Sequence, residues 1–232
     1  METIKEKLLL LKKCDTDFEI FGSWEHRYEL NEPLPVKDFR AIEKKYDCTF
    51  PEDYRIFITE IGNGGAGPGL GLFPVGKQDG DFREGELIDC WERGRLIGDL
   101  SKLFQHTKGV DAIDDFWRNL EKKLNIKIEE LPEEENKALY RKYRKDLFAY
   151  VDSVYDPRDL MQGAIPICHI GCAKRLWLVI NGPQNGNVWL DLRCNDIGIF
   201  PYLNNVEEPM TFYDWYLYWL VESLAEIESM QK

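Results

Sequence analysis

The sequence has few of the residues on which common catalytic and export machineries depend. Only three of its 232 residues are histidine and five are serine, and no Gly-x-Ser-x-Gly segment occurs, which argues against a serine hydrolase. No apolar run approaches the roughly 18 residues that cross a bilayer. The N-terminus is charged on both sides of a short leucine run and lacks a small-residue cleavage site, so we expect no signal peptide.

Acidic residues outnumber basic ones, and this imbalance limits the kinds of molecule that the protein is expected to bind. The chain has 42 acidic and 30 basic residues, a net charge of −12 and a pI near 4.8. Phosphate backbones and anionic membranes would repel such a surface, whereas a basic protein would be attracted to it. The composition, 44% hydrophobic and 31% charged, is that of a folded protein. Six cysteines without an export signal indicate reduced thiols and a cytoplasmic protein.

The first third of the chain reads as helices followed by a glycine-rich stop. Apolar residues at helical spacing predict helices over 2–13 and 36–46, and a third that starts after Pro51 and runs to Ile61. Gly62 suits a left-handed helix cap. The Leu70–Val75 stretch predicts a short strand, and residues 76–98 predict a loop.

The order of the later elements indicates an α+β fold. Residues 108–162 are charged and contain two helical patterns, which predicts a helical insertion with a solvated face. Strand patterns then gather late in the chain, and a tryptophan-rich helix from Thr211 closes it. Because helices come first, hairpin-linked strands next and a helix last, the fold should be α+β. Three strands are predicted, at 164–170, 176–180 and 188–192, and residues 198–200 then lead to Pro201.

Three constellations invite a chemical interpretation that their context does not support. The glycine run at 62–71 lacks the Lys-Ser/Thr ending of a phosphate loop and follows a helix instead of a strand. Ser101 and His106 are five residues apart, a spacing that implies no catalytic geometry. Four residues could suggest a zinc site: Cys168, His169, Cys172 and Cys194. However, no second close pair completes the set of four ligands, and Cys168 and His169 are adjacent on a predicted strand, so their side chains would point in opposite directions. We therefore predict no catalytic residues, no metal and no cofactor.

Several segments together resemble the SUKH superfamily, the Smi/Knr proteins. The stretch HRYELNEPLPVKDFRAIEKKYDCTFPEDYRIFITEIGNGGAGPGLGLFPVG is similar to the family's opening block, and GDLSKLFQHT to a linker of bacterial members. GAIPICHIGCAKRLWLVINGPQNGNVWLDLRCNDIGIFP and TFYDWYLYWLVESL look like its sheet and closing helix. The resemblance implies one domain over 1–232, with 108–162 as an insertion. It also implies helices packed on a mixed, mostly antiparallel sheet, and a scaffold role for Gly62, Gly64, Gly65, Trp189 and Asp191.

The resemblance further implies a function. Many bacterial members are immunity proteins that bind and neutralise a protein toxin, often a nuclease, and the family has no established catalytic residues to carry over. A basic nuclease cleft would suit an acidic inhibitor. A regulatory scaffold of the Smi/Knr type and an enzyme with an unrecognised site remain as alternatives. The expected toxin-binding residues are acidic and lie in predicted loops: Asp79, Asp81, Glu84, Glu86, Asp89, Glu207 and Glu208.

Overall fold

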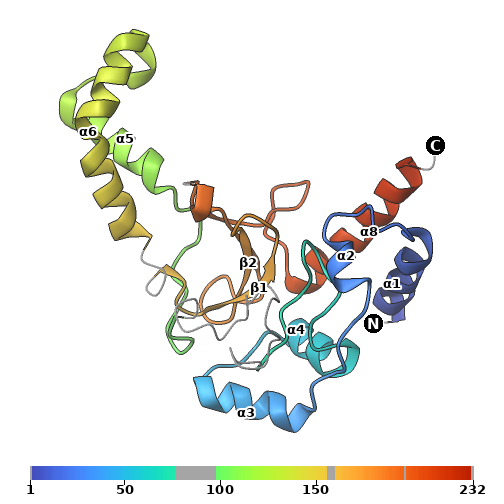
Figure 1. Cartoon of the computed structure of the whole chain (residues 1–232). Coiled ribbons are helices and arrows are strands. Elements are labelled where there is room, and N and C mark those ends of the chain that lie inside the picture. Colours follow the sequence, from blue (N-terminus) through green and yellow to red (C-terminus); the bar gives the residue numbers. More distant parts are fainter. Residues whose placement is uncertain (1, 77–97, 156–159, 196, 231–232) are drawn as a thin grey trace, which may run out of the picture.

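The computed structural model describes residues 2–76, 98–155, 160–195 and 197–230 (Figure 1). Within these ranges the chain is α+β, as predicted. The helices and helical turns are α1 (Glu2–Cys14), α2 (Ser23–His26), α3 (Val36–Tyr46), α4 (Glu52–Ile56), η1 (Phe57–Ile61), α5 (Ala112–Leu124), η2 (Ile128–Glu130), α6 (Glu133–Val154), η3 (Arg193–Asn195) and α8 (Phe212–Met230). The strands are β1 (Ala164–His169), β2 (Arg175–Val179), β3 (Val188–Asp191) and β4 (Ile199–Pro201).

The described strands form a sheet in chain order, β1-β2-β3-β4, and each pairs antiparallel with the next. The resemblance implied a mixed, mostly antiparallel sheet, and every described pairing is antiparallel. All six residues of β1 and four of the five in β2 are buried. Since side chains alternate along a strand, a continuous buried run means that both faces of the sheet are covered.

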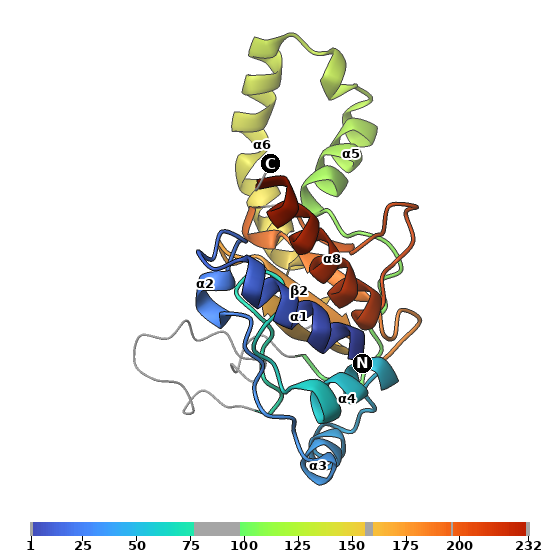
Figure 2. The same ribbon diagram turned by 90° about the vertical axis from the view of Figure 1, so that its right-hand side faces the viewer.

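One face of the sheet packs against the N- and C-terminal helices. Figure 2 shows α1 and α8 side by side in front of the strands. Leu176 and Leu178 of β2 contribute to this core together with Trp215, Tyr216 and Leu220 of α8. The packing of helices on the sheet, which the resemblance implied, is therefore present in the structure. None of the described helices has both the length and the apolar character required to cross a membrane.

The other face of the sheet is covered by a second core. Trp177 and Trp189, paired across β2 and β3, are both fully buried there. They pack in a cluster with Phe104 and with Leu147 and Val151 from the C-terminal half of α6. The charged segment that the sequence marks as an insertion thus supplies apolar residues to the protein interior.

Helices α5 and α6 form an arm, defined here as residues 112–154, that projects beyond the sheet (Figures 1 and 2). Tyr155 joins the two helices at the base of the arm: its hydroxyl accepts the Ala112 N–H at 2.8 Å. Further out, the helices meet through aromatic rings. Trp117 stacks on Tyr140, with ring centroids 6.0 Å apart, and Phe116 packs on Tyr150.

Both edges of the sheet are capped by chain segments outside the strands. Leu72 forms an isolated bridge with Cys168 at the β1 edge, and Val110 forms one with Ile199 at the β4 edge. Leu70–Val75 is therefore not the strand that its sequence predicts, because its pairing is limited to single bridges. Covering an edge in this way removes unpaired backbone groups that could recruit another strand.

The glycine-rich segment after η1 begins with Gly62, whose backbone conformation differs from the left-handed cap that the sequence predicts. Gly62 has φ 178° and is extended, so it is not a left-handed cap. Its N–H donates to the Phe57 carbonyl at 3.0 Å, which closes a wide π-type turn. Gly64 and Gly65 do have positive φ, and a Cβ on Gly65 would lie 2.5 Å from the Glu29 carbonyl oxygen.

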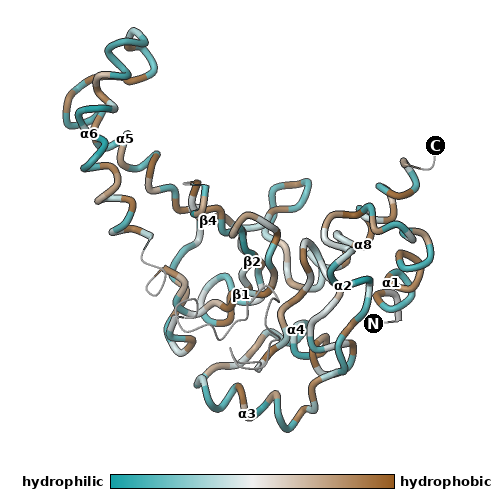
Figure 3. The backbone as a smooth tube through the Cα atoms, viewed as in Figure 1, coloured by the Kyte–Doolittle hydropathy of each residue, from teal (hydrophilic) through white to brown (hydrophobic). Residues whose placement is uncertain are grey.

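The N-terminal helices follow their periodicity closely. Helix α3 has the bounds that the sequence predicts, and hydrophilic and hydrophobic residues alternate along it (Figure 3). Phe39 is the fully buried residue of its inner face. The predicted helix after Pro51 is also present, but its second half, Phe57–Ile61, widens into a π-helix.

Candidate binding surface

Two of the seven predicted toxin-binding residues lie in the described part of the chain. Glu207 and Glu208 are exposed in the turn between β4 and α8. The remaining five lie outside the described residues, as do the predicted loop residues around them: Asp79, Asp81, Glu84, Glu86 and Asp89.

The turn that carries the two glutamates, residues 202–209, is held by its own hydrogen bonds. The Asn204 side-chain oxygen accepts the N–H groups of Val206 at 3.0 Å and Glu208 at 2.9 Å. A bridge between Leu203 and Pro209 closes the base of the turn. Val206 is 70% exposed at its tip. The turn therefore presents a hydrophobic side chain beside two carboxylates in a defined conformation.

The outer face of α8 continues this acidic character. Asp214, Glu222, Glu226 and Glu228 are all exposed, and Val221 lies exposed among them. The inner face is fixed by packing and by a hydrogen bond from the Tyr216 hydroxyl to the Ala66 carbonyl at 2.8 Å. Because these contacts fix the orientation of α8 about its axis, they also fix which side chains of α8 face the solvent. We call the 202–209 turn and the exposed face of α8 the acidic C-terminal face.

The start of α8 is fixed by a reciprocal cap. The Thr211 hydroxyl accepts the Asp214 N–H at 3.2 Å and donates to the Asp214 carboxylate at 2.8 Å. The Asp53 carboxylate of α4 accepts the Tyr213 N–H at 3.0 Å. These contacts fix the first turn of α8 and attach it to α4.

The binding surface predicted from the sequence did not include the carboxylates of α8, although the sequence contains a signal for this acidic segment. Between Arg193 and Lys232 there are seven acidic residues and no lysine or arginine. An interval of one sign is informative because most surface segments intersperse both signs. The apolar spacing of the helix drew attention to its buried stripe instead of its outer face.

Asp191 and its partners form a buried polar cluster where β3 meets the base of the arm. Its carboxylate accepts the Trp177 indole N–H at 3.1 Å and pairs with both Nε and Nη2 of Arg193, at 2.9 and 2.6 Å. Arg193 also donates to the Tyr155 carbonyl at 3.3 Å. All of these contacts are structural, which agrees with the scaffold role that the resemblance implied for Asp191.

The residues that suggested zinc are not gathered at one point. The Cys168 thiol is buried and donates to the Pro68 carbonyl at 2.7 Å, and burial raises its pKa. Cys172 and Cys194 are exposed. In the part of the chain that the structure describes, no group of three His, Cys, Asp or Glu side chains is placed to hold a metal ion.

Ser101 and His106 likewise have separate partners. The Ser101 hydroxyl donates to the Asp99 carboxylate at 2.6 Å, while Nε2 of His106 lies 3.1 Å from the Leu160 carbonyl oxygen. Burial lowers the pKa of His106. A hydroxyl that donates to a carboxylate away from the imidazole is not activated as a nucleophile.

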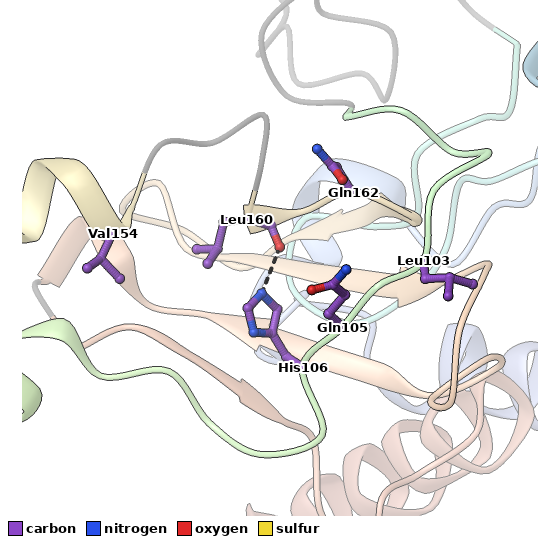
Figure 4. Close-up of a pocket in the computed structure, with 6 residues that line it drawn as sticks. All are labelled: Leu103, Gln105, His106, Val154, Leu160 and Gln162. Carbon is purple, nitrogen blue, oxygen red and sulfur yellow. Dashed lines mark hydrogen bonds between the residues drawn. The ribbon is translucent and has the colours of Figure 1, made fainter.

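A cavity of about 330 Å³ lies beside His106, where the linker before the arm passes the start of β1 (Figure 4). Its polar lining consists of the His106 ring and the carboxamides of Gln105 and Gln162. Its apolar lining is Leu103, Val154 and Leu160. Among the lining residues that the structure describes there is no carboxylate, lysine or arginine.

A second buried polar group lies under α2. Tyr28 donates its hydroxyl to the Asp15 carboxylate at 2.5 Å, and Nδ1 of His26 accepts the Tyr28 N–H at 3.1 Å. Burial lowers the pKa of His26 to about 4 and raises that of Tyr28. These side chains connect the loop after α1 to α2 and have no opening to a cavity described above.

The described elements define an α+β protein in which the Asp191 and Asp15 clusters connect parts of the fold. The comparison with protein-family models then identifies the SMI1 / KNR4 family (SUKH-1), whose model matches residues 33–211. The chain belongs to this family. No curated protein and no solved structure matches it.

Proposed function

We propose that this chain is an immunity-type member of the SUKH family that binds a cognate protein toxin and occludes it without catalysis. Family membership supports a binding role. The observation that carries the proposal is the acidic C-terminal face, in which six exposed carboxylates lie on the turn and on α8. These are Glu207, Glu208, Asp214, Glu222, Glu226 and Glu228.

The distribution of charge supports a basic partner. Outside residues 108–162 the chain has 29 acidic and 19 basic residues, so most of the net charge lies on the body. An enzyme that cleaves nucleic acid must attract phosphate, and an acidic inhibitor steers itself to the same cleft. The lysines of the neighbouring α1 weaken this face only in part, because Lys12 pairs with Glu29.

The same face offers hydrophobic contact as well as charge. Val206 at the turn and Val221 on α8 are 70% and 44% exposed, each beside carboxylates. Protein interfaces commonly combine an apolar centre with a polar rim. We further propose that the complex forms in the cytoplasm and that residues 108–162 are an insertion within a single domain.

Co-expression with the toxin encoded beside this chain tests the proposal. Wild-type protein should co-purify with the toxin and protect the cell. Glu222→Lys with Glu226→Lys should lower the association rate at least about tenfold and reduce protection, because the charge that steers the partner is reversed. Glu134→Lys with Glu135→Lys on the arm makes the same charge change at exposed positions away from this face and should protect normally.

Two outcomes would refute different parts of the proposal. If wild-type protein neither binds the toxin nor prevents killing, the immunity role is wrong and a regulatory scaffold becomes the better hypothesis. If both charge-reversed variants protect equally, the role stands but the acidic C-terminal face is not the toxin-binding surface.

A further inference from the structure

The arm carries a surface whose charge is opposite to that of the rest of the protein. Between residues 137 and 145 the sequence has five basic residues and no acidic one. These residues lie in the middle of α6, in the part of the arm that projects from the body (Figure 1). A local excess of five positive charges is unusual in a chain with a net charge of −12.

Helical geometry places most of these cations on one side of α6. Lys137, Arg141, Arg144 and Lys145 are three or four residues apart in succession or adjacent, and all are exposed. Within the described part of the chain, Lys137 is the one member of this group that forms salt bridges, with Glu133 and Glu134. Among the described residues, no carboxylate lies within ion-pair distance of the other three.

Exposed aromatic rings accompany the cations. Tyr140 and Phe148 are each 43% exposed, although neither position is needed to close the core. The Arg144 guanidinium lies over the Phe148 ring, 5.4 Å from its centroid. Tyr140 is held from behind by Trp117 of α5. We call this set, Lys137, Tyr140, Arg141, Arg144, Lys145 and Phe148, the basic aromatic face; it extends roughly 17 Å along α6.

The face is also hollowed at its outer end. A depression of about 390 Å³ is lined by Glu133, Asn136, Lys137, Tyr140 and Arg141. A tyrosine ring between two cations can contact an apolar side chain while its neighbours pair with carboxylates. The recess is therefore suited to a ligand that carries both kinds of group.

We propose that the basic aromatic face is a docking site for a short acidic segment of another protein, one in which carboxylates alternate with a hydrophobic side chain. The exposed lysine and arginine side chains favour carboxylates in this segment, and the exposed aromatic rings favour a hydrophobic side chain beside them. Glu133, Glu134 and Glu135 in the first turn of the same helix would repel phosphates and carboxylates alike, so charge does not separate a peptide from nucleic acid, and the oligonucleotide in the test below does so. A basic toxin would be repelled by the basic aromatic face, so this partner differs from the one proposed for the acidic C-terminal face.

Fluorescence anisotropy with the full chain provides the test. The probe is a labelled twelve-residue peptide, Glu-Glu-Glu-Leu repeated three times, at low ionic strength. A second peptide replaces each leucine by serine, and a twelve-nucleotide oligothymidylate replaces the peptide altogether. We expect the leucine peptide to bind most tightly, and we expect its affinity to fall as salt is added.

Two pairs of substitutions then locate the site. Arg141→Glu with Arg144→Glu should weaken binding of the leucine peptide at least about tenfold, because two attractive contacts become repulsive. Arg118→Glu with Lys122→Glu reverses the same number of charges at exposed positions on α5 and should change the affinity less than about threefold. Tyr140→Ala should bring the affinity for the leucine peptide down to that for the serine peptide. Circular dichroism verifies that each variant retains its helices.

The proposal is overturned if the leucine peptide binds no better than the serine peptide or the oligonucleotide. It is also overturned if Arg141→Glu with Arg144→Glu binds as tightly as wild type. Sedimentation of the protein alone separates a third case: self-association abolished by the same two substitutions would assign the face to a second copy of this chain.

Discussion

The Asp191 cluster makes a quantitative prediction about stability. The Asp191 and Arg193 side chains are only 8% and 12% exposed, and their contacts are bidentate. Replacing Asp191 by alanine would leave a buried guanidinium and the Trp177 indole N–H without their acceptor. Removing one partner of a buried ion pair typically costs about 3–5 kcal/mol, and we expect a loss in that range.

A double-mutant cycle of Asp191→Ala and Arg193→Ala measures the coupling energy between the two side chains. Arg193→Ala should cost less than Asp191→Ala, about 2–3 kcal/mol, because the carboxylate retains the Trp177 indole and the backbone N–H of residue 193. The combined variant should then be more stable than the sum of the single losses predicts, by about 1–3 kcal/mol. Urea unfolding followed by tryptophan fluorescence measures each value.

Three outcomes would count against this reasoning. A loss below about 1 kcal/mol for Asp191→Ala would mean that water replaces the carboxylate, and the cluster would then not be dry. Strict additivity of the two substitutions would mean that the pair is not coupled. A changed denaturant slope would mean that the transition is not a single cooperative step, so the free energies would not be comparable.

Further predictions follow from the backbone, a histidine and the thiols. Gly65→Ala should destabilise the protein clearly more than Gly186→Ala. Both glycines have positive φ, which costs alanine about 1–2 kcal/mol, but only at Gly65 does a backbone oxygen lie 2.5 Å from the new Cβ. The urea midpoints of the two variants compare the losses. The pKa of His26 falls from 6.5 to about 4 on folding, so stability should drop as pH decreases from about 6.5 to 4, by about 3 kcal/mol in all, and the His26→Phe variant should lose this dependence in unfolding curves. Mass-mapped alkylation should modify Cys172 rapidly in the native protein and Cys168 only after unfolding.

The sequence predicts most elements of this fold because their patterns are local. Leu176–Ile180 is apolar at every position, which correctly indicated a strand buried on both sides. The exception at Gly62 has a physical cause. The rule for helix caps assumes an α-helical last turn, but the π-type bond to Phe57 widens that turn and leaves Gly62 extended.

What covers the second face of the sheet could not be read from the sequence. Leu147 and Val151 have the spacing of any amphipathic helix, and nothing local indicates that they meet Trp177 and Trp189. Surface sites are harder still, because a carboxylate has the same sequence signature whether it solvates a helix or contacts a partner. Glu207 and Glu208 were predicted because they lie in a loop, whereas Glu222 lies on a helix whose apolar stripe gives no indication of a role for its outer face.

The two ends of the arm should differ in how much sequence change they tolerate. The inner ends of its helices, with Leu147, Val151 and Tyr155, are committed to the protein interior and tolerate little change. Further out, the described contacts join the two helices to each other, as in the stacking of Trp117 on Tyr140. Whole turns added to both helices there would extend the arm by about 5.4 Å each and leave the sheet and its two cores unchanged. Substitutions in the proposed docking site on the outer part of α6 should therefore change the stability of the folded body little.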